Sequence, residues 1–484
     1  MSSRREFLQL AGTTALATAS IGSITSNAQE FLSNPLHSIA SGQDLLALQQ
    51  RFVDLRFGMF LHFNMATFQD REWGDPTSSP NLFHPGSLDT DQWASAAKAA
   101  KMTWGCLTTR HHDGFCIWPT KTQGNSVAQT AQKVDVVRAY VDSFRTAGLR
   151  VGLYYSILSL RDDIRHFNVT PAKIQLIKDQ LTELFTSYGE IDILITDGWD
   201  APWSRITYSE VPFRAIYDHI KALQPQCLIC DLNAASYPTG GLYYSDIKAF
   251  EQNAGQHVPE GSDLPALSCV TLTEGWFWKQ ADIHGKLKPA ETVVNEWLVP
   301  LNRRHCNLIL NAPPTRDGRL APNVVDRLVE IGRLWSPEQP ATRLIQHPAI
   351  TTLNLATGRP IHASSSPDTV GPDLANDGSF RSAWSPDDSD MSPWIEVDLQ
   401  GDQRVSTIAL VQGESKEAAA TIGSFRFEGL HDSDWVPMAE SQNPASTTVL
   451  AIKPVTVRKV RVHFTRGQGS LSIADIGLYN EPHP

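Results

Sequence analysis

The chain has 484 residues, a formal net charge of −11 and 19% charged residues. This length exceeds that of a typical single domain, so we expect two or three domains. Lysine and arginine form no long basic run, which argues against a nucleic-acid partner, and beyond the first 28 residues no stretch reaches the roughly 20 apolar residues of a membrane span.

The first 28 residues have the pattern of an export signal. Arg4-Arg5 precede a weakly apolar run at 10–24, and small residues follow at 26–28. Paired arginines before such a run resemble a twin-arginine signal, which exports folded bacterial proteins. An ordinary N-terminal helix is the alternative. We expect residues 1–28 to be a signal peptide and the protein to be periplasmic or extracellular.

Residues 29–336 alternate short apolar runs with amphipathic ones. We expect strands at residues 56–63, 102–109, 149–157, 191–196, 227–232, 242–247, 268–273 and 307–310, and helices at 135–147, 170–188, 211–223, 289–303 and 322–335. Thr170 suits a helix N-cap, and Pro171 suits the first helical position. Eight strands alternating with helices predict an α/β fold, a TIM-like (β/α)₈ barrel. A doubly wound open sheet is the alternative, but no glycine-rich phosphate loop follows any strand.

The remaining chain has a different pattern. Residues 337–350 contain three prolines and no periodicity, so we expect a linker there. From 351 to 484 short β-runs alternate with turn residues, and the expected strands are 394–399, 405–411, 424–430, 446–452 and 459–464. This pattern predicts a C-terminal all-β sandwich.

Polar and aromatic side chains follow most of the expected barrel strands at their C-terminal ends. They are His62 with Glu72-Trp73, Arg110-His111-His112, Tyr154-Tyr155, Asp197, Glu251, and Glu274 with Trp276. Because the carboxyl ends of the strands of a parallel barrel meet at one rim, we expect these side chains to surround one site.

Two chemistries fit this set of residues. The histidines and Asp197 could hold a divalent metal ion, as in barrel hydrolases. However, adjacent residues of a strand point to opposite sides, so His111 and His112 would not easily share an ion. In the other chemistry, one carboxylate attacks a sugar and a protonated one assists the leaving group, while histidine and tryptophan bind the sugar. We favour this second chemistry.

Several motifs resemble the α-L-fucosidases of glycoside hydrolase family 29. They are residues 56–63, His111-His112-Asp113-Gly114-Phe115, residues 152–156, Asp197-Gly198, and the run from Asn307-Leu-Ile-Leu-Asn311 to Asp317-Gly318-Arg319. The resemblance spans about residues 48–335 and keeps the order of the motifs. It implies a retaining, exo-acting enzyme that releases L-fucose from glycans on a (β/α)₈ barrel. It also implies that no cofactor or metal is needed.

The resemblance implies roles for individual residues. Asp197 falls on the nucleophile, and the sugar-binding residues fall on His62, Glu72, Trp73, His111, His112 and Tyr155, with Trp276 beside them. For the acid/base we favour Glu251, with Glu274 as the alternative. A retaining pair should stand about 5–5.5 Å apart.

The sequence departs from the family pattern around the acid/base. Leu267 occupies a position that is Glu in many members, and Arg110 stands where Lys is usual. Two rival hypotheses therefore stay open. One is a non-catalytic fucose lectin on the same barrel, and the other is a glycosidase for another sugar with fucose-like stereochemistry. In each case the expected partner is a fucosylated, or similarly glycosylated, oligosaccharide or glycoconjugate.

The C-terminal region carries a second resemblance. The run from Ala375-Asn-Asp-Gly-Ser to Trp384, followed by residues 394–399, resembles the discoidin, or coagulation factor 5/8 type C, sandwich. The resemblance implies a domain that often binds sugars, sometimes with a structural Ca²⁺, and that in an enzyme can simply brace the barrel.

Overall fold

The computed structural model describes residues 42–122, 125–337, 343–367, 370–413 and 422–482. The predicted signal at 1–28 lies outside these ranges. Within them, no helix combines the length and the apolar character needed to cross a bilayer.

Eight parallel strands form a nearly closed barrel, which confirms the predicted fold class. They pair in the order β5-β4-β3-β2-β1-β9-β8-β7. Their bounds are β1 Phe57–Leu61, β2 Trp104–Arg110, β3 Arg150–Ser156, β4 Ile193–Asp197, β5 Leu228–Asp231, β7 Lys248–Glu251, β8 Ala266–Thr271 and β9 Cys306–Asn311. Almost every residue in these strands is buried, as expected for a sheet covered on both faces.

The interior of the barrel is filled by alternate residues of the strands. Ile193 and Ile195 of β4 pack there with Tyr154 of β3, whereas Leu194 belongs to the larger core under the surrounding helices. Helix α2 (Gly42–Leu55) adds Phe52 to the interior cluster, where its ring lies 5.4 Å from that of Trp104. The same alternation brings Asp197 to the inside at the end of β4.

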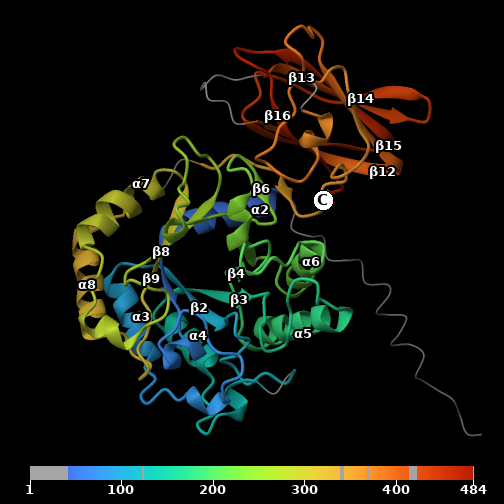
Figure 1. Ribbon diagram of the computed structural model, residues 1–484. Coiled ribbons are helices and arrows are strands. Elements are labelled where there is room, and N and C mark those ends of the chain that lie inside the picture. Colours follow the sequence, from blue (N-terminus) through green and yellow to red (C-terminus); the bar gives the residue numbers. More distant parts are fainter. Residues whose placement is uncertain (1–41, 123–124, 338–342, 368–369, 414–421, 483–484) are drawn as a thin grey trace, which may run out of the picture. The chain divides into compact units, whose positions relative to one another are not determined.

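Helices surround the strands, as Figure 1 shows for α3, α4, α5, α6 and α8. Their bounds are α3 Thr90–Ala99, α4 Val136–Thr146, α5 Pro171–Ser187, α6 Phe213–Leu223, the π-helix η7 Thr292–Leu298 with α7 Val299–Asn302, and α8 Pro322–Leu334. Thr170 is the N-cap of α5, and its side chain accepts a hydrogen bond from the backbone N–H of Lys173. The helices predicted from periodicity are thus confirmed.

One predicted barrel strand is wrong. Residues 242–247 were expected to form the sixth barrel strand, but only β6 (Leu242–Tyr243) forms there, and it pairs with β10 (Ala349–Ile350). The barrel strand is β7, which begins at Lys248. The side chain of Lys248 is buried because its ammonium donates hydrogen bonds to the carbonyl oxygens of Ala234, Tyr237 and Pro238 at 2.9, 2.9 and 3.2 Å.

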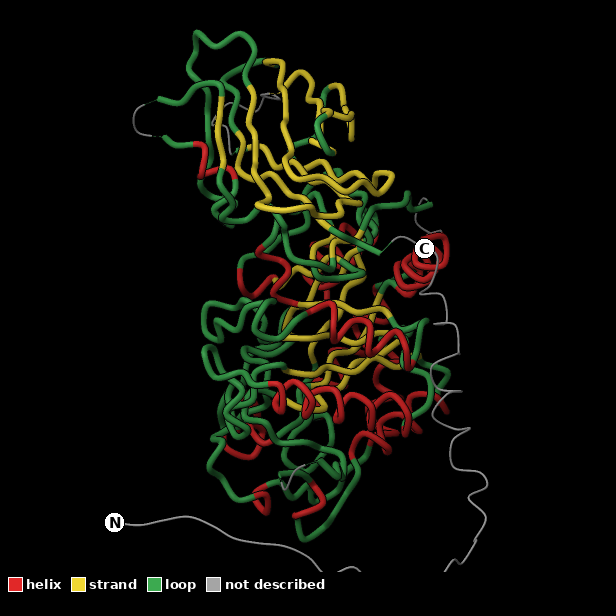
Figure 2. The backbone as a smooth tube through the Cα atoms, turned by 90° about the vertical axis from the view of Figure 1, so that its right-hand side faces the viewer, coloured by secondary structure: helices red, strands yellow, loops and turns green. Residues whose placement is uncertain are grey.

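The C-terminal part is an antiparallel β-sandwich, and in Figure 2 it consists almost entirely of strands and loops. Its strands are β11 Ile361–Ala363, β12 Trp394–Gln412, β13 Ile422–His431, β14 Asp434–Gln442, β15 Thr447–Arg466 and β16 Ile473–Tyr479. They pair as β11-β12-β15-β13-β14, with β16 on β12, around a separate apolar core. Pairs of predicted short strands are fused in β12 and β15.

Candidate active site

A pocket of about 540 Å³ opens at the rim formed by the carboxyl ends of the barrel strands. It is lined by Phe60, His62, Glu72, Trp73, His111, His112, Tyr154, Asp197, Trp203, Leu232, Glu251, Asn253, Ala254, Glu274, Gly275, Trp276 and Lys279. The loops after β1, β2, β4, β7 and β8 all contribute, so side chains far apart in the sequence meet here.

Asp197 is held by three hydrogen bonds at the end of β4. Its Oδ2 accepts from the Tyr154 hydroxyl at 2.7 Å, and its Oδ1 accepts from the backbone N–H of Gly198 at 2.7 Å and from Asn233 Nδ2 at 2.8 Å. The side chain is 13% exposed. Donors on both oxygens fix the orientation of the carboxylate toward the pocket.

Glu251 is the second carboxyl group at the base of the pocket. It ends β7 and is partly buried. Burial first, and then the nearby charge of Asp197, raise its pKa to about 7, and a hydrogen bond from Trp276 acts in the opposite direction. A carboxyl group that is about half protonated near neutral pH, beside a carboxylate held in position by three donors, has the properties of an acid/base next to a nucleophile.

Three buried histidines form one wall. His62 Nδ1 lies 2.8 Å from Asn311 Oδ1, and His112 Nδ1 lies 2.7 Å from Ser156 Oγ, while His112 Nε2 lies 3.6 Å from Asp197 Oδ2. Burial lowers the pKa of His62 to about 3 and that of His112 to about 4, and it lowers the pKa of His111 well below 6.5. The wall is therefore uncharged at neutral pH.

Glu72 connects the loops after β1 and β8. Its Oε2 accepts from the backbone N–H of Trp276 at 3.0 Å, and its Oε1 lies 2.5 Å from Lys279 Nζ. The ring of Trp73, beside it, lies 4.6 Å from that of His112. These contacts hold two aromatic residues, Trp73 and Trp276, at the pocket wall.

The structure places one predicted site residue outside the pocket. Tyr155 points out of the barrel, and its hydroxyl donates to Gln180 Oε1 at 2.7 Å. Tyr154 lines the pocket instead, because side chains along a strand alternate between its two sides. Both tyrosines belong to the Gly152–Ser156 region of the motif, so sequence resemblance alone did not distinguish them.

The other predicted residues come together. His62, Glu72, Trp73, His111, His112, Asp197, Glu251 and Trp276 all line the pocket, and Glu274 does so with an exposed side chain. Sequence reasoning missed Trp203 and Lys279, which lie in loops, and Asn233, which lies in the short 3-10 helix η4 (Leu232–Ser236). Trp203 is 44% exposed and packs against Trp73 and His112 with ring distances of 5.0 and 4.4 Å. A tryptophan soon after the Asp197-Gly198 turn was the available signal in the sequence.

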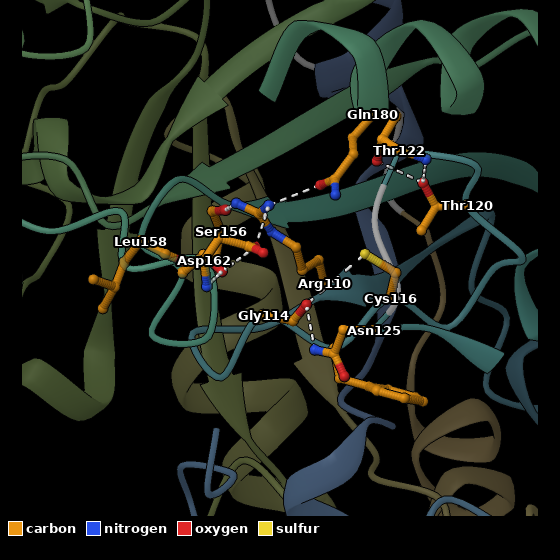
Figure 3. Close-up of polar contacts among 12 residues, drawn as sticks. Arg110, Gly114, Cys116, Thr120, Thr122, Asn125, Ser156, Leu158, Asp162 and Gln180 are labelled. Carbon is orange, nitrogen blue, oxygen red and sulfur yellow. Dashed lines mark hydrogen bonds and ion pairs between the residues drawn. The ribbon is translucent and has the colours of Figure 1, made fainter. Parts of the chain in front are cut away.

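Arg110 lies in a buried polar cluster behind the histidines, drawn in Figure 3. Its guanidinium donates to Gln180 Oε1 at 2.7 Å and to the Ser156 carbonyl at 2.6 Å, and it lies 3.8 Å from Asp162 Oδ2. Arg110 thus joins the end of β2 to the end of β3, and its charge contributes to the lowered pKa of His112.

A metal centre was the alternative chemistry for this site. No three His, Cys, Asp or Glu side chains in the described ranges are arranged to hold a metal ion. The Nδ1 atoms of His62 and His112 are engaged by Asn311 and Ser156, which leaves Nε2 as the one other nitrogen of each ring at the pocket wall.

Comparison with known proteins identifies both parts of the chain. The α-L-fucosidase family model matches residues 72–337, and the F5/8 type C domain model matches residues 360–479. The chain is 25% identical to alpha-L-fucosidase 1 of Arabidopsis thaliana over 448 residues, covering 87% of this chain and 84% of that protein. It is 26% identical to tissue alpha-L-fucosidase of Mus musculus over 268 residues, covering 53% and 56%.

A solved structure shares the fold. The crystal structure of SpGH29 superposes with a TM-score of 0.51 at 21% identity, covering 90% of this chain and 97% of that one. The α-L-fucosidase model covers more than half of the residues. The chain therefore belongs to the α-L-fucosidase family and is a glycoside hydrolase with a C-terminal F5/8 type C domain.

Proposed function

We propose that the protein is a retaining, exo-acting α-L-fucosidase that releases L-fucose from fucosylated oligosaccharides or glycoconjugates. The observation that carries this proposal is the pairing of Asp197, whose carboxylate accepts three hydrogen bonds, with Glu251, whose pKa is raised to about 7 by burial and by the charge of Asp197. A carboxyl group with a raised pKa beside a second carboxylate suits an acid/base next to a nucleophile.

The reaction proceeds in two displacements. Asp197 attacks the anomeric carbon of fucose while Glu251 gives its proton to the departing glycosidic oxygen, which leaves a covalent fucosyl ester on Asp197. Glu251, now ionised, takes a proton from water, and the resulting hydroxide attacks the same carbon from the opposite face. Asp197 leaves, and two inversions produce net retention. Each step returns one proton to Glu251 or removes one from it.

The pocket wall supports a sugar substrate. Trp73 and Trp276 offer aromatic faces that pack against the apolar side of a pyranose, and the uncharged histidines and Glu72 offer hydrogen-bonding groups for its hydroxyls. Barrel side chains such as Phe60 and Tyr154 line the pocket together with Asp197, and a pocket at the end of a filled barrel suits a terminal sugar and hence exo-action.

The test is the stereochemistry of the first product. Proton NMR of 4-nitrophenyl α-L-fucoside during hydrolysis should show the α-anomer of L-fucose first, and Asp197→Asn should reduce turnover at least ~10³-fold in a folded protein. First formation of the β-anomer would contradict a retaining mechanism. Binding of fucose without turnover of any aryl fucoside would favour the non-catalytic fucose lectin. Turnover of another aryl glycoside, but not of the fucoside, would favour a glycosidase for another sugar with fucose-like stereochemistry.

We also propose that residues 1–28 are a twin-arginine signal that exports the enzyme. The support is Arg4-Arg5 before the apolar run. Replacing both arginines with lysine should keep active enzyme in the cytoplasmic fraction, whereas unchanged export would contradict a twin-arginine route.

A further inference from the structure

Hydrogen bonds behind the pocket wall determine which nitrogen of His62 carries a hydrogen. Asn311 Nδ2 donates to the carbonyl oxygen of Trp276 at 2.8 Å, and a carbonyl can only accept. The amide of Asn311 is thereby oriented with its oxygen toward His62, 2.8 Å from Nδ1. Because that amide oxygen is also only an acceptor, His62 Nδ1 must be the donor.

The same reasoning applies to His112 with a different partner. The Ser156 hydroxyl has a single hydrogen, and it donates that hydrogen to the Leu158 carbonyl at 2.8 Å (Figure 3). Ser156 Oγ can then only accept from His112 Nδ1, which lies 2.7 Å away. His112 therefore carries a hydrogen on Nδ1 as well.

A ring with a hydrogen on Nδ1 is either neutral, with a lone pair on Nε2, or an imidazolium with hydrogens on both nitrogens. Both side chains are at least 95% buried. Burial lowers both pKa values far below 7, and it does so for His112 although Asp197 acts in the opposite direction. At neutral pH both rings are thus neutral, and each presents the Nε2 lone pair to the pocket.

We propose that Asn311 and Ser156 are positioning residues that fix His62 and His112 as hydrogen-bond acceptors. The pocket then selects a sugar whose free hydroxyls donate their hydrogens to the two Nε2 atoms. The carboxylates of Asp197 and Glu72 add further acceptors. The ligand class is a neutral polyol with unsubstituted hydroxyls, and its identity as L-fucose rests on the function proposed above.

This arrangement leaves two acceptor atoms close together in the pocket without a ligand. His112 Nε2 and Asp197 Oδ2 are 3.6 Å apart, and both are acceptors in the neutral state. A sugar hydroxyl that donates to one of them relieves their repulsion. The competing interpretation is an ion pair between an imidazolium at His112 and the Asp197 carboxylate, and it predicts a hydrogen on Nε2.

The direct test is long-range ¹H–¹⁵N correlation NMR of the full-length enzyme labelled with ¹⁵N in its histidine rings, without ligand, at pH 7. We expect His62 and His112 to show a protonated Nδ1 and an unprotonated Nε2. Asn311→Leu should change the ring-nitrogen signals of His62 alone, and Ser156→Ala should change those of His112 alone. These changes also assign the signals to the two residues. A protonated Nε2 on either ring in the unsubstituted enzyme would overturn the proposal for that ring.

A matched control lies on the same strand as Asn311. Asn307 Nδ2 donates to the Phe52 carbonyl, and its Oδ1 accepts from Trp104 Nε1, each at 3.0 Å. Asn307→Leu thus removes the same buried amide without touching a histidine, and it should leave both ring patterns unchanged. If it alters them as Asn311→Leu does, the effect is general destabilisation and the positioning role is wrong.

Binding of substituted sugars supplies the second arm. Fluorine cannot donate a hydrogen bond, so at each hydroxyl that donates to a histidine the deoxyfluoro and deoxy analogues of L-fucose should both bind about tenfold more weakly than L-fucose. Asn311→Leu should weaken the binding of L-fucose itself by a similar factor and reduce the difference in affinity between L-fucose and these analogues. Deoxyfluoro analogues that bind as tightly as L-fucose at every position would overturn the proposal. If L-fucose does not bind at all, the proposed function fails, and the NMR arm still decides the tautomers.

Discussion

The hydroxyl of Tyr154 donates a 2.7 Å hydrogen bond to Oδ2 of Asp197 from the neighbouring strand. The two residues lie on adjacent strands, β3 and β4, whose register pairs Tyr154 with Ile195, two residues before Asp197 on the same side of β4. One of the three donors that orient the proposed nucleophile is thus a residue of the barrel interior.

Removal of that hydroxyl should impair catalysis. Hydrogen bonds to charged groups contribute about 1.5–3 kcal/mol, so Tyr154→Phe should lower kcat/KM roughly 10- to 150-fold. The neighbouring change Tyr155→Phe removes a hydroxyl that bonds to Gln180 outside the pocket, and kcat/KM should stay within about threefold of the wild-type value. Steady-state kinetics of both variants on one aryl fucoside compare them. If Tyr155→Phe lowers kcat/KM more than Tyr154→Phe does, Tyr155 and not Tyr154 faces the pocket.

The pH dependence of activity should report Glu251. Its carboxyl group must be protonated to act as the acid, and its pKa is raised to about 7 by burial and by Asp197. The protonated fraction therefore falls as the pH rises through about 7, and kcat/KM for a fucosyl disaccharide should fall with it. Glu251→Gln should abolish this basic limb along with most of the activity. A limb that persists in Glu251→Gln would assign the titration to another group.

The leaving group should distinguish Glu251 from Glu274. Only a poor leaving group needs a proton, so Glu251→Ala should keep much of its first-step rate on a dinitrophenyl fucoside and almost none on a disaccharide, and azide should restore turnover. Glu274→Ala is the matched variant, because this glutamate lines the same pocket with an exposed side chain. If Glu274→Ala shows the leaving-group dependence and Glu251→Ala does not, the roles of the two glutamates are exchanged.

A buried ion pair below the site should contribute strongly to stability. Lys221 Nζ lies 2.8 Å from Asp246 Oδ2, and both side chains are almost fully buried. Lys221→Met leaves the carboxylate of Asp246 without its counter-charge, and this should cost about 3–5 kcal/mol of unfolding free energy. The exposed Lys98 of α3 is the control, and Lys98→Met should change stability by about 0.5 kcal/mol or less. Urea unfolding measures both, and equal losses would contradict the account.

The sequence was sufficient to predict the barrel because apolar strands and capped helices follow local rules. Thr170 caps α5 as its side chain predicted, and Asp135 caps α4 at the expected start of that helix. The sixth barrel strand could not be predicted because β7 contains Lys248, whose burial depends on three carbonyl groups brought near by the fold. The orientation of side chains at the end of β3 could not be predicted from the sequence either. Tyr154 and Tyr155 are chemically alike, and only the register of β3 decides which one lines the pocket.

Loop residues at the pocket were the hardest to anticipate. Trp203 follows the Asp197-Gly198 turn in a segment without periodicity, where Asp200 and Arg205 adopt positive φ angles of 44° and 62°. Its position against Trp73 depends on a contact between the loops after β1 and β4, which no local pattern encodes. Strand-end residues, by contrast, were found because a parallel barrel collects them at one rim.

The central claim is that Asp197 forms a covalent bond with the sugar. The enzyme would be incubated with 2-deoxy-2-fluoro-α-L-fucosyl fluoride. The fluorine at C2 slows both displacements, whereas the anomeric fluoride is a good leaving group, so the fucosyl-enzyme ester should accumulate. Mass spectrometry of the digested enzyme should find one added deoxyfluorofucosyl group, on the peptide that carries Asp197, and none in Asp197→Asn. A label on another carboxylate, or steady turnover of the reagent by Asp197→Asn, would contradict the account.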